Sequence, residues 1–392
     1  MNAQNYTAPA SVDRLQQRAL RVGVLGLVVC AFGAFGDPDQ FFRSYLLGYL
    51  LTLGLTLGCL GLVMLQHMTG GNWGIIIRRP LESATRTLPL LALLFLPIVF
   101  GLRRIYVEWT GPHKDSLSEF QKGYLTIPGY ITRAVFYFAV WMILMFLLNR
   151  WSRQQDSSSQ DRRLRRKLQL LSGPGIILYV FTMTFAAVDW VMSLSPHWLS
   201  TIYGFLFVAG QAVSAMSLMI IVVVMLSQSE PMSRVLQPRH LHDLGKLLFA
   251  FVMLWAYFSF SQLLIIWSGN LTEEITFYRS RLYGGWGTVA VILLLFHFAL
   301  PFFLLLSRDL KRSAKFLPKL AALIILMRAV DLFWMTGPEF SPTVFHLSPL
   351  DIAAPLGIGG IWLAYFAKQL KDRPLLPLGD PHLEEAIERH EH

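Results

Sequence analysis

The chain has 392 residues, of which 54% are hydrophobic and only 15% are charged, and its formal net charge is +10. Soluble domains carry about 25% charged residues. The charges here separate apolar runs of about 18 to 25 residues, the length that crosses a bilayer core of roughly 30 Å. The composition therefore predicts a polytopic membrane protein and excludes a soluble domain. Hydrolase, kinase and soluble metalloenzyme functions have no support, because the sequence contains no GxGxxG, Walker A, HExxH or CxxC pattern.

Ten apolar runs predict ten membrane-spanning helices in an all-α protein. The N-terminal residues 1–21 are polar and lack the arrangement of a cleaved signal peptide, so we expect the first run to remain as a helix. Residues 1–21 and 372–392 are expected to flank a transmembrane domain at 22–371. The predicted spans lie near residues 22–36, 44–66, 87–105, 133–149, 172–190, 200–226, 245–267, 284–306, 317–335 and 350–369.

Lys and Arg are distributed unevenly among the segments between the spans. Alternate loops are rich in acids, and the positive-inside rule then places both termini in the cytoplasm. This bias also accounts for the net charge. We interpret residues 150–170 as a flexible basic linker whose charges act as a topology signal, with contact to anionic lipid headgroups as the alternative. The tail from Asp380 is expected to form a short helix able to dock on a neighbour. Most Lys and Arg residues lie in the N-terminal segment, in loops 67–86, 150–171, 227–246 and 307–319, and at the start of the C-terminal tail.

Ionisable side chains inside the spans are candidate functional groups, because they are costly in a bilayer. Arg328 and Asp331 are three residues apart, which places them on one helical face near the middle of their span. They form either a mutually neutralising packing pair or part of a proton path, and the sequence leaves both interpretations open. His297 lies four residues before Pro301, which removes the hydrogen bond to the His297 carbonyl. A core histidine bonded to a neighbour is favoured over a kink that holds water.

The remaining polar residues of the spans suggest helix packing and an interior seam. Gly54 and Gly58 predict close helix packing. Tyr257 lies among aromatic residues, and with Gln262 and Gln211 it is predicted to line an interior seam between spans six and seven. A b-type haem needs two facing histidines, and only His297 lies deep in a span, so we expect no haem. The two cysteines lie inside apolar runs, so we expect no iron–sulfur centre, disulfide or other metal site.

Several segments together resemble one family. They are HMTGGNWG (67–74), DWVMSLSPHWLSTIYG (189–204), WAYFSFSQLLIIWSGNLTEEITFY (255–278), MRAVDLFW (327–334) and DPHLEE (380–385). In this order and spacing they look like the F-type membrane subunit of bacterial alternative complex III. That complex is a quinol:cytochrome c, or high-potential iron–sulfur protein, oxidoreductase, and its F-type subunit belongs with the NrfD and polysulfide-reductase membrane subunits.

The resemblance implies a fold of two four-helix bundles, formed by spans two to five and six to nine, with a flanking helix at each end. It implies a multi-pass subunit of an electron transport chain in the bacterial inner membrane. It also implies partners: a related C-type membrane subunit, a periplasmic iron–sulfur subunit, multihaem cytochrome c subunits and small anchors. Haem and iron–sulfur clusters would then reside in the partners, and the quinol site in the C-type neighbour. The catalytic share of this chain itself stays open.

The resemblance gives the turn at 189–204 three candidate roles. Asp189 and His197 match the family's DW…PHW pattern, so the turn could dock an adjacent subunit, transfer protons or contact a quinol headgroup. The family often has an acid before Pro196, where this chain has Ser195, and this difference removes one carboxylate from a relay.

The candidate proton-path residues are accordingly Asp189, Arg328, Asp331, His297 and Tyr257, with His67 and His197 near the two surfaces. Asp331→Asn is then expected to reduce proton translocation while assembly stays intact. A structural scaffold without proton conduction is the alternative. A stand-alone transporter ranks last, because no paired interrupted spans are visible.

Overall fold

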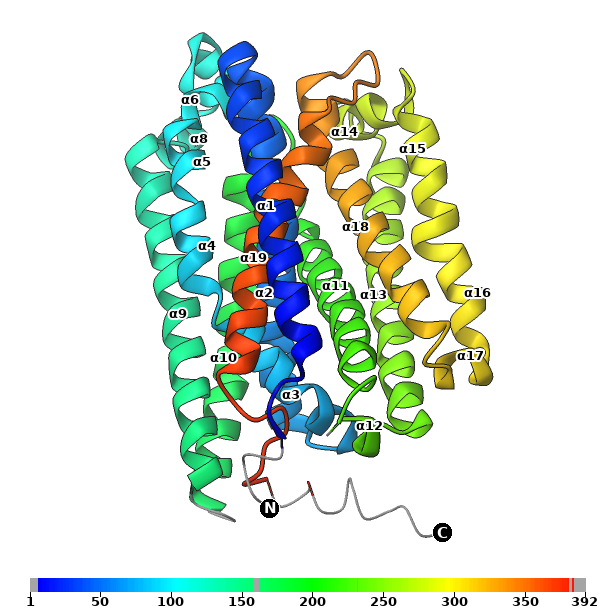
Figure 1. The fold of residues 1–392 in the computed structure, drawn as a ribbon. Coiled ribbons are helices and arrows are strands. Elements are labelled where there is room, and N and C mark those ends of the chain that lie inside the picture. The colour runs from blue at the N-terminus through cyan, green and yellow to red at the C-terminus, as the bar shows by residue number, and fades with distance from the viewer. Residues whose placement is uncertain (1–5, 158–161, 231, 381–382, 384–392) are drawn as a thin grey trace.

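The computed structural model describes residues 6–157, 162–230, 232–380 and 383, and every regular element among these residues is a helix (Figure 1). Ten helical segments are long and apolar enough to cross a membrane, which confirms the predicted all-α membrane class and the number of spans. They are α1 (Ala10–Gly36), α2 (Pro38–Thr69), the run from Trp73 to Phe100 that ends with α4 (Leu88–Leu94) and α5 (Leu96–Phe100), α9 (Ile127–Ser157), α10 (Arg162–Trp190), α11 (Tyr203–Leu226), α13 (Pro238–Gly269), α15 (Trp286–Ile292) continued by η4 (Leu293–Ala299) and α16 (Leu300–Leu306), α18 (Leu317–Phe340) and α19 (Leu350–Lys371).

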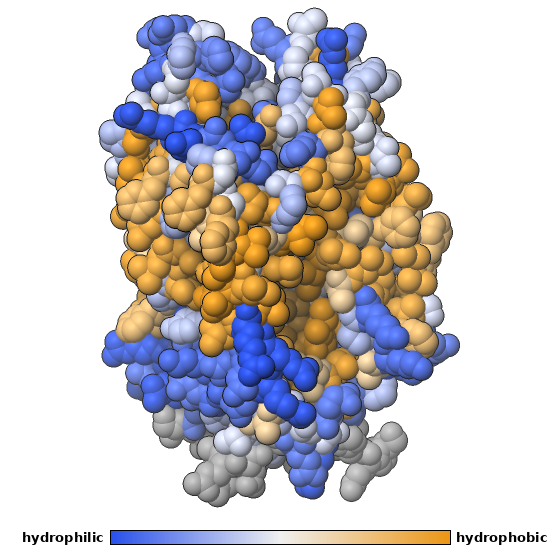
Figure 2. Space-filling model, turned by 45° about the horizontal axis from the view of Figure 1, so that its top comes forward, coloured by the Kyte–Doolittle hydropathy of each residue, from blue (hydrophilic) through white to orange (hydrophobic). Residues whose placement is uncertain are grey.

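Apolar side chains form a belt between two hydrophilic ends on the face shown in Figure 2. One end is called the terminal end, because α1 begins and α19 ends there, beside α3 (Asn72–Thr85), α12 (Met232–Val235) and α17 (Arg308–Arg312). The other is called the opposite end, and it contains α6 (Leu102–Ile105), α8 (Glu119–Tyr124) and α14 (Thr272–Leu282). This distribution is typical of a protein whose middle lies in hydrocarbon.

The spans form two neighbouring groups of four. Helices α2, α4–α5, α9 and α10 make the first bundle, and α11, α13, α15–α16 and α18 make the second (Figure 1). The central helices α2 and α11 are 89% and 83% buried over their most apolar stretch, whereas no other span exceeds 56%. They meet at Gly58, where an added β-carbon would lie 2.2 Å from the carbonyl oxygen of Gln211. Gly58 therefore allows the close packing that the sequence predicts.

Helices α1 and α19 pack against each other, so the two spans that flank the bundles in sequence lie together in space. Gly23 and Gly26 of α1 face Gly360 and Gly357 of α19, and a β-carbon at Gly26 would lie 2.6 Å from the backbone nitrogen of Gly357. Small residues at such spacing let helix backbones approach closely, which strengthens van der Waals contact in lipid.

We expect Gly26→Ala to destabilise the protein by about 1–3 kcal/mol, because overpacking forces the two backbones apart. Gly36→Ala is the matched control, since no atom lies within 4 Å of a β-carbon placed at Gly36. Alanine also favours a helix over glycine, so the control should be neutral or stabilising. Thermal unfolding in detergent measures both variants, and equal melting temperatures would contradict the proposed contact.

The structure corrects two predictions for the terminal end. The sequence predicts a loop at 67–86, but α3 forms there, with Arg78, Arg79 and Glu82 each at most 2% exposed. These charges can be buried because Glu82 forms ion pairs with both arginines. The predicted linker 150–170 is helical wherever it is described, as α9 runs to Ser157 and α10 begins at Arg162. Its Arg, Lys, Gln and Leu residues favour helix once the span has begun one.

The C-terminal segment 372–380 docks on the chain itself. Leu375 and Leu376 are fully buried, and the backbone nitrogen of Leu375 donates to the Tyr6 carbonyl at 2.8 Å. Asp380 forms an ion pair with Arg78 at 2.8 Å. The predicted helix that follows Asp380 falls outside the described residues except for Leu383.

Candidate functional site

A buried polar cluster in the second bundle has Asp331 at its centre. Arg328, one turn earlier on α18, pairs with Asp331, and both residues are 3% exposed. The indole nitrogen of Trp255 on α13 donates to the same Asp331 oxygen at 3.2 Å. A buried charge costs several kcal/mol unless it is paired and hydrogen-bonded. The pair and the indole therefore hold the carboxylate in one position.

Helix α11 makes room for the Arg328 guanidinium. A β-carbon at Gly210 would lie 2.3 Å from the Arg328 Cζ atom, so the absence of a side chain there creates the space. The Phe207 ring lies 5.6 Å from the same atom, within the range of a cation–π interaction. The charged pair of α18 is thus enclosed by α11 on one side and by Trp255 on another.

His297 joins the cluster from η4, a π-helical turn that precedes Pro301. Its ring meets the Trp255 ring edge to face, with centroids 4.2 Å apart and an interplanar angle of 82°. His297 is 1% exposed, and its Nδ1 atom has no hydrogen-bond partner among the described residues. The helix widens into this π turn, Leu293–Ala299, just before Pro301. Such turns are frequent at functional sites. We call Asp331, Arg328, Trp255 and His297 the Asp331 cluster.

A second ion pair lies toward the opposite end on the same face of α18. Glu339 is eight residues after Asp331, about 12 Å along the helix, and accepts a hydrogen bond of 2.6 Å from Arg281 of α14. Arg281 is 1% exposed and also donates to the Met335 carbonyl at 2.6 Å. Polar groups thus continue from the Asp331 cluster toward the opposite end.

Tyr257 does not join this cluster. It is 63% exposed on the outer face of α13, where its ring contacts Phe258. Residues two apart on an α-helix point about 200° apart, so the same helix that turns Trp255 inward turns Tyr257 outward. Of the other seam residues, Gln262 and Gln211 are each 3% exposed.

We expect Trp255→Phe to lower stability by about 1.5–3 kcal/mol, the range for a hydrogen bond to a charged group. The substitution removes the indole nitrogen that donates to Asp331 and keeps an aromatic ring beside His297. Chemical unfolding in detergent measures the change. Trp267→Phe is the control, because Trp267 is 74% exposed. A larger loss in the control would contradict the assigned role of Trp255.

Asp189 lies in a separate cluster, at the opposite end of the first bundle. Arg133 of α9 binds both of its carboxylate oxygens at 2.9 Å, and the Tyr137 hydroxyl donates to one of them at 2.7 Å. Asp189 is fully buried. The Arg133 guanidinium in turn lies 3.9 Å from the centre of the Tyr124 ring. The carboxylate therefore ties α9 to α10, in addition to any role in proton transfer.

The turn after Asp189 connects the two bundles. Trp198 is 1% exposed and stacks on Phe277 of α14, with ring centroids 3.9 Å apart. Gln121 of α8 donates to the Pro196 carbonyl at 2.6 Å. His197 is exposed, and its Nε2 atom lies 3.4 Å from the Ser116 hydroxyl. The turn is thus anchored from both sides, with His197 on the surface and Asp189 in the interior.

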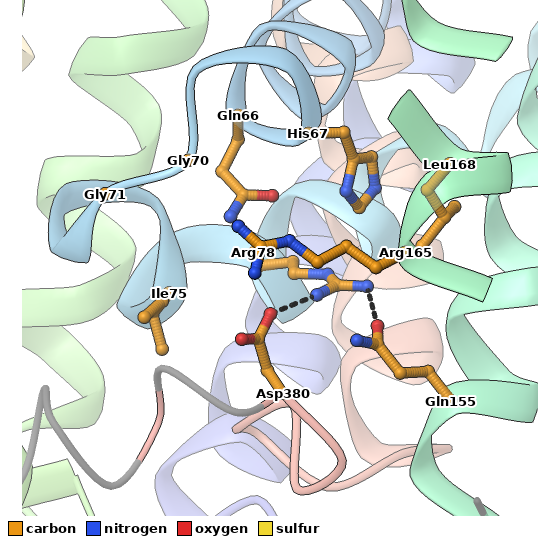
Figure 3. Close-up of a pocket in the computed structure, with 10 residues that line it drawn as sticks. All are labelled: Gln66, His67, Gly70, Gly71, Ile75, Arg78, Gln155, Arg165, Leu168 and Asp380. Atoms are coloured by element: carbon orange, nitrogen blue, oxygen red, sulfur yellow. Dashed lines mark hydrogen bonds and ion pairs between the residues drawn. The ribbon is translucent and has the colours of Figure 1, made fainter. Parts of the chain in front are cut away.

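A third polar cluster closes the terminal end of the first bundle. Gln66 and His67 of α2 point toward a cavity of about 20 Å³, enough for one water (Figure 3). The Gln66 Oε1 and His67 Nε2 atoms are buried and have no partner among the described residues. Arg78 lines the same cavity and donates to Asp380 at 2.8 Å and to Gln155 at 2.7 Å. His67 is thus buried beside this cavity at the terminal end, with 7% of its surface exposed.

Comparison with known proteins found no matching family model and no matching curated protein. The functional interpretation therefore depends on the residues and their geometry.

Several residues of these sites were missed by sequence reasoning. Arg133 begins a predicted span, and Arg281 and Glu339 fall in predicted loops, so in sequence each resembles an ordinary charge at the end of a span. Trp255 lies in a stretch rich in aromatic residues, and nothing in the sequence distinguishes it from its neighbours. A useful signal would have been that each charged residue lies within two turns of an apolar run, where a partner on another helix could bury it.

Proposed function

We propose that this chain is the F-type membrane subunit of a quinol-oxidising complex of the alternative complex III class, in the bacterial plasma membrane. In this proposal the second bundle carries protons between the Asp331 cluster and the opposite end, which the positive-inside rule makes periplasmic. The observation that carries the proposal is a buried carboxylate near the middle of α18, followed by the Arg281–Glu339 pair on the same face. Ionisable groups inside spans commonly mark proton relays.

The proposed complex supplies the redox chemistry from its other subunits. Quinol would be oxidised in the C-type neighbour, and electrons would pass through iron–sulfur clusters to c-type haems. A change of charge in that neighbour would alter the protonation of buried acids in this chain, because their pKa values respond to nearby charge. The exposed His197 of the turn after Asp189 is then available for a periplasmic partner, with direct quinol contact as its less favoured role.

A mild-detergent pull-down of the tagged full chain from its native membrane tests the proposed complex. We expect c-type haem and iron–sulfur subunits to co-purify with quinol:cytochrome c activity, seen by haem staining and an activity assay. If the chain is recovered alone and colourless while the extracted membrane proteins keep full activity, the proposal is wrong.

A scaffold without proton conduction is the second candidate. The observation that favours it is the full pairing of Asp189 by Arg133 and Tyr137, a geometry that also suits purely structural cross-linking. Normal proton stoichiometry after neutralising every buried acid would support the scaffold.

A further inference from the structure

An open basic groove lies at the terminal end, on the outer side of α9. Its volume is about 460 Å³. Three elements contribute to it: the end of α3, the last turns of α9 and the docked C-terminal segment. The residues that matter here are Arg86, Arg150, Arg153, Arg373, Met145 and Phe146.

The groove crosses the edge of the apolar belt. Phe146 is 56% exposed and Ile143 is 58% exposed, so this face of α9 is apolar and faces lipid. Arg150 and Arg153 follow Phe146 at spacings of four and seven residues, which places all three on one helical face. Both arginines are exposed. Along α9, then, an apolar surface passes directly into a basic one, at the depth where phospholipid headgroups lie.

The two inner arginines of the groove, Arg86 and Arg373, are only partly neutralised by the carboxylates near them. The acid nearest to Arg86 is Asp372 at 2.9 Å, which is 69% exposed. Arg373 lies 3.8 Å from Glu82, a carboxylate that Arg78 and Arg79 already bind. Burial and the neighbouring Arg86 lower the pKa of Arg373 to about 10, so its guanidinium stays charged at neutral pH while lacking full neutralisation.

The two inner arginines are enclosed at their Nε atoms, so the exposed Arg150 and Arg153 supply the donors within reach of a ligand. The Nε atoms of Arg86 and Arg373 are buried and have no hydrogen-bond partner among the described residues. Guanidinium groups bind phosphate oxygens through paired hydrogen bonds, and such charge-assisted bonds are about twice as strong as neutral ones. A phosphate in this groove would bring negative charge and could accept hydrogen bonds from the exposed Arg150 and Arg153.

We propose that the groove binds the phosphate headgroup of an anionic glycerophospholipid, with the acyl chains along Met145 and Phe146. Basic pockets beside transmembrane helices bind such headgroups. The bound lipid would also hold the C-terminal segment against α9, because Arg373 comes from that segment. This inference does not depend on the proposed redox complex.

The test measures binding of phosphatidylglycerol to the purified full chain in mild detergent, by native mass spectrometry, with phosphatidylcholine as the neutral probe. Arg150→Gln/Arg153→Gln removes two exposed charges of the groove. Arg166→Gln/Lys167→Gln is the matched control: it removes two exposed charges of α10 at the same end, outside the groove. Since each basic residue near a membrane surface contributes about fivefold, we expect a loss of roughly tenfold or more in the groove variant and a much smaller loss in the control.

Three results would contradict the proposed lipid site. Equal losses in the two variants would indicate general attraction to a basic surface. Phosphatidylcholine has the same phosphate, but its charge is balanced by choline, so equal retention of this lipid would show that the groove does not select a net negative headgroup. Displacement of phosphatidylglycerol by inorganic phosphate alone would assign the groove to a soluble anion.

Arg373→Gln is the second variant. It should both weaken lipid binding and increase proteolysis of the C-terminal segment.

Discussion

Glu82→Gln is expected to lower the free energy of unfolding by about 3–5 kcal/mol, the cost of breaking a buried ion pair from one side. Glu82 is 1% exposed and accepts hydrogen bonds from Arg78 at 3.0 Å and Arg79 at 2.6 Å. A neutral amide leaves both guanidinium groups in place with one carboxylate fewer. Asp380 and Asp156 still bind them, one on each arginine, but from the partly exposed side.

Chemical unfolding of the purified protein in detergent measures the effect. Glu119→Gln is the control, because Glu119 is 90% exposed and pairs with Lys122 on the surface of α8. Exposed pairs contribute little to stability, so this variant should unfold like the parent. If both variants unfold at the same denaturant concentration, the cluster around Glu82 does not stabilise the terminal end.

Asp331→Asn is expected to have a destabilising effect of similar size, because it leaves the Arg328 charge buried without its counter-ion. Arg328→Gln/Asp331→Asn removes both charges together and should therefore be more stable than Asp331→Asn alone. The difference is a coupling energy, which a double-mutant cycle isolates. The paired burial of these residues, each 3% exposed, is the reason for this expectation.

The cycle is read from melting temperatures of the parent, the two single variants and the double variant. Strictly additive losses would contradict the direct pairing.

The paired burial also makes Asp331→Asn alone an ambiguous test of proton transfer, because a loss of stability could mimic a loss of transfer. The double variant becomes the better test, because its charge balance is preserved.

The sequence predicts those features that depend on local spacing. Ten spans follow from the length of the apolar runs, and the Arg328–Asp331 pair follows from a separation of three residues on a helix. Gly58 was predicted to pack closely for a similar reason, since small residues at helical spacing indicate close contact. Each of these inferences needs only the geometry of a single helix.

Features that depend on helix rotation and on contacts between distant segments could not be predicted. Aromatic residues occupy all sides of α13, so the hydrophobic pattern does not reveal that Trp255 faces inward and Tyr257 outward. The bond between Arg133 and Asp189 joins residues 56 positions apart. Buried α3 resembles a charged loop in sequence, because its charges are neutralised only by folding and by the docked segment around Asp380.

Proton transfer through the second bundle is tested most directly by the number of protons moved per electron. The assembled complex is placed in sealed vesicles, and quinol oxidation and pH change are followed together for the parent and for Arg328→Gln/Asp331→Asn. Tyr257→Phe serves as the exposed control. We predict a lower proton-to-electron ratio in the double variant, with electron transfer retained and the control unchanged. An unchanged ratio in the double variant, with normal turnover, would contradict the account and leave the Asp331 cluster a structural element.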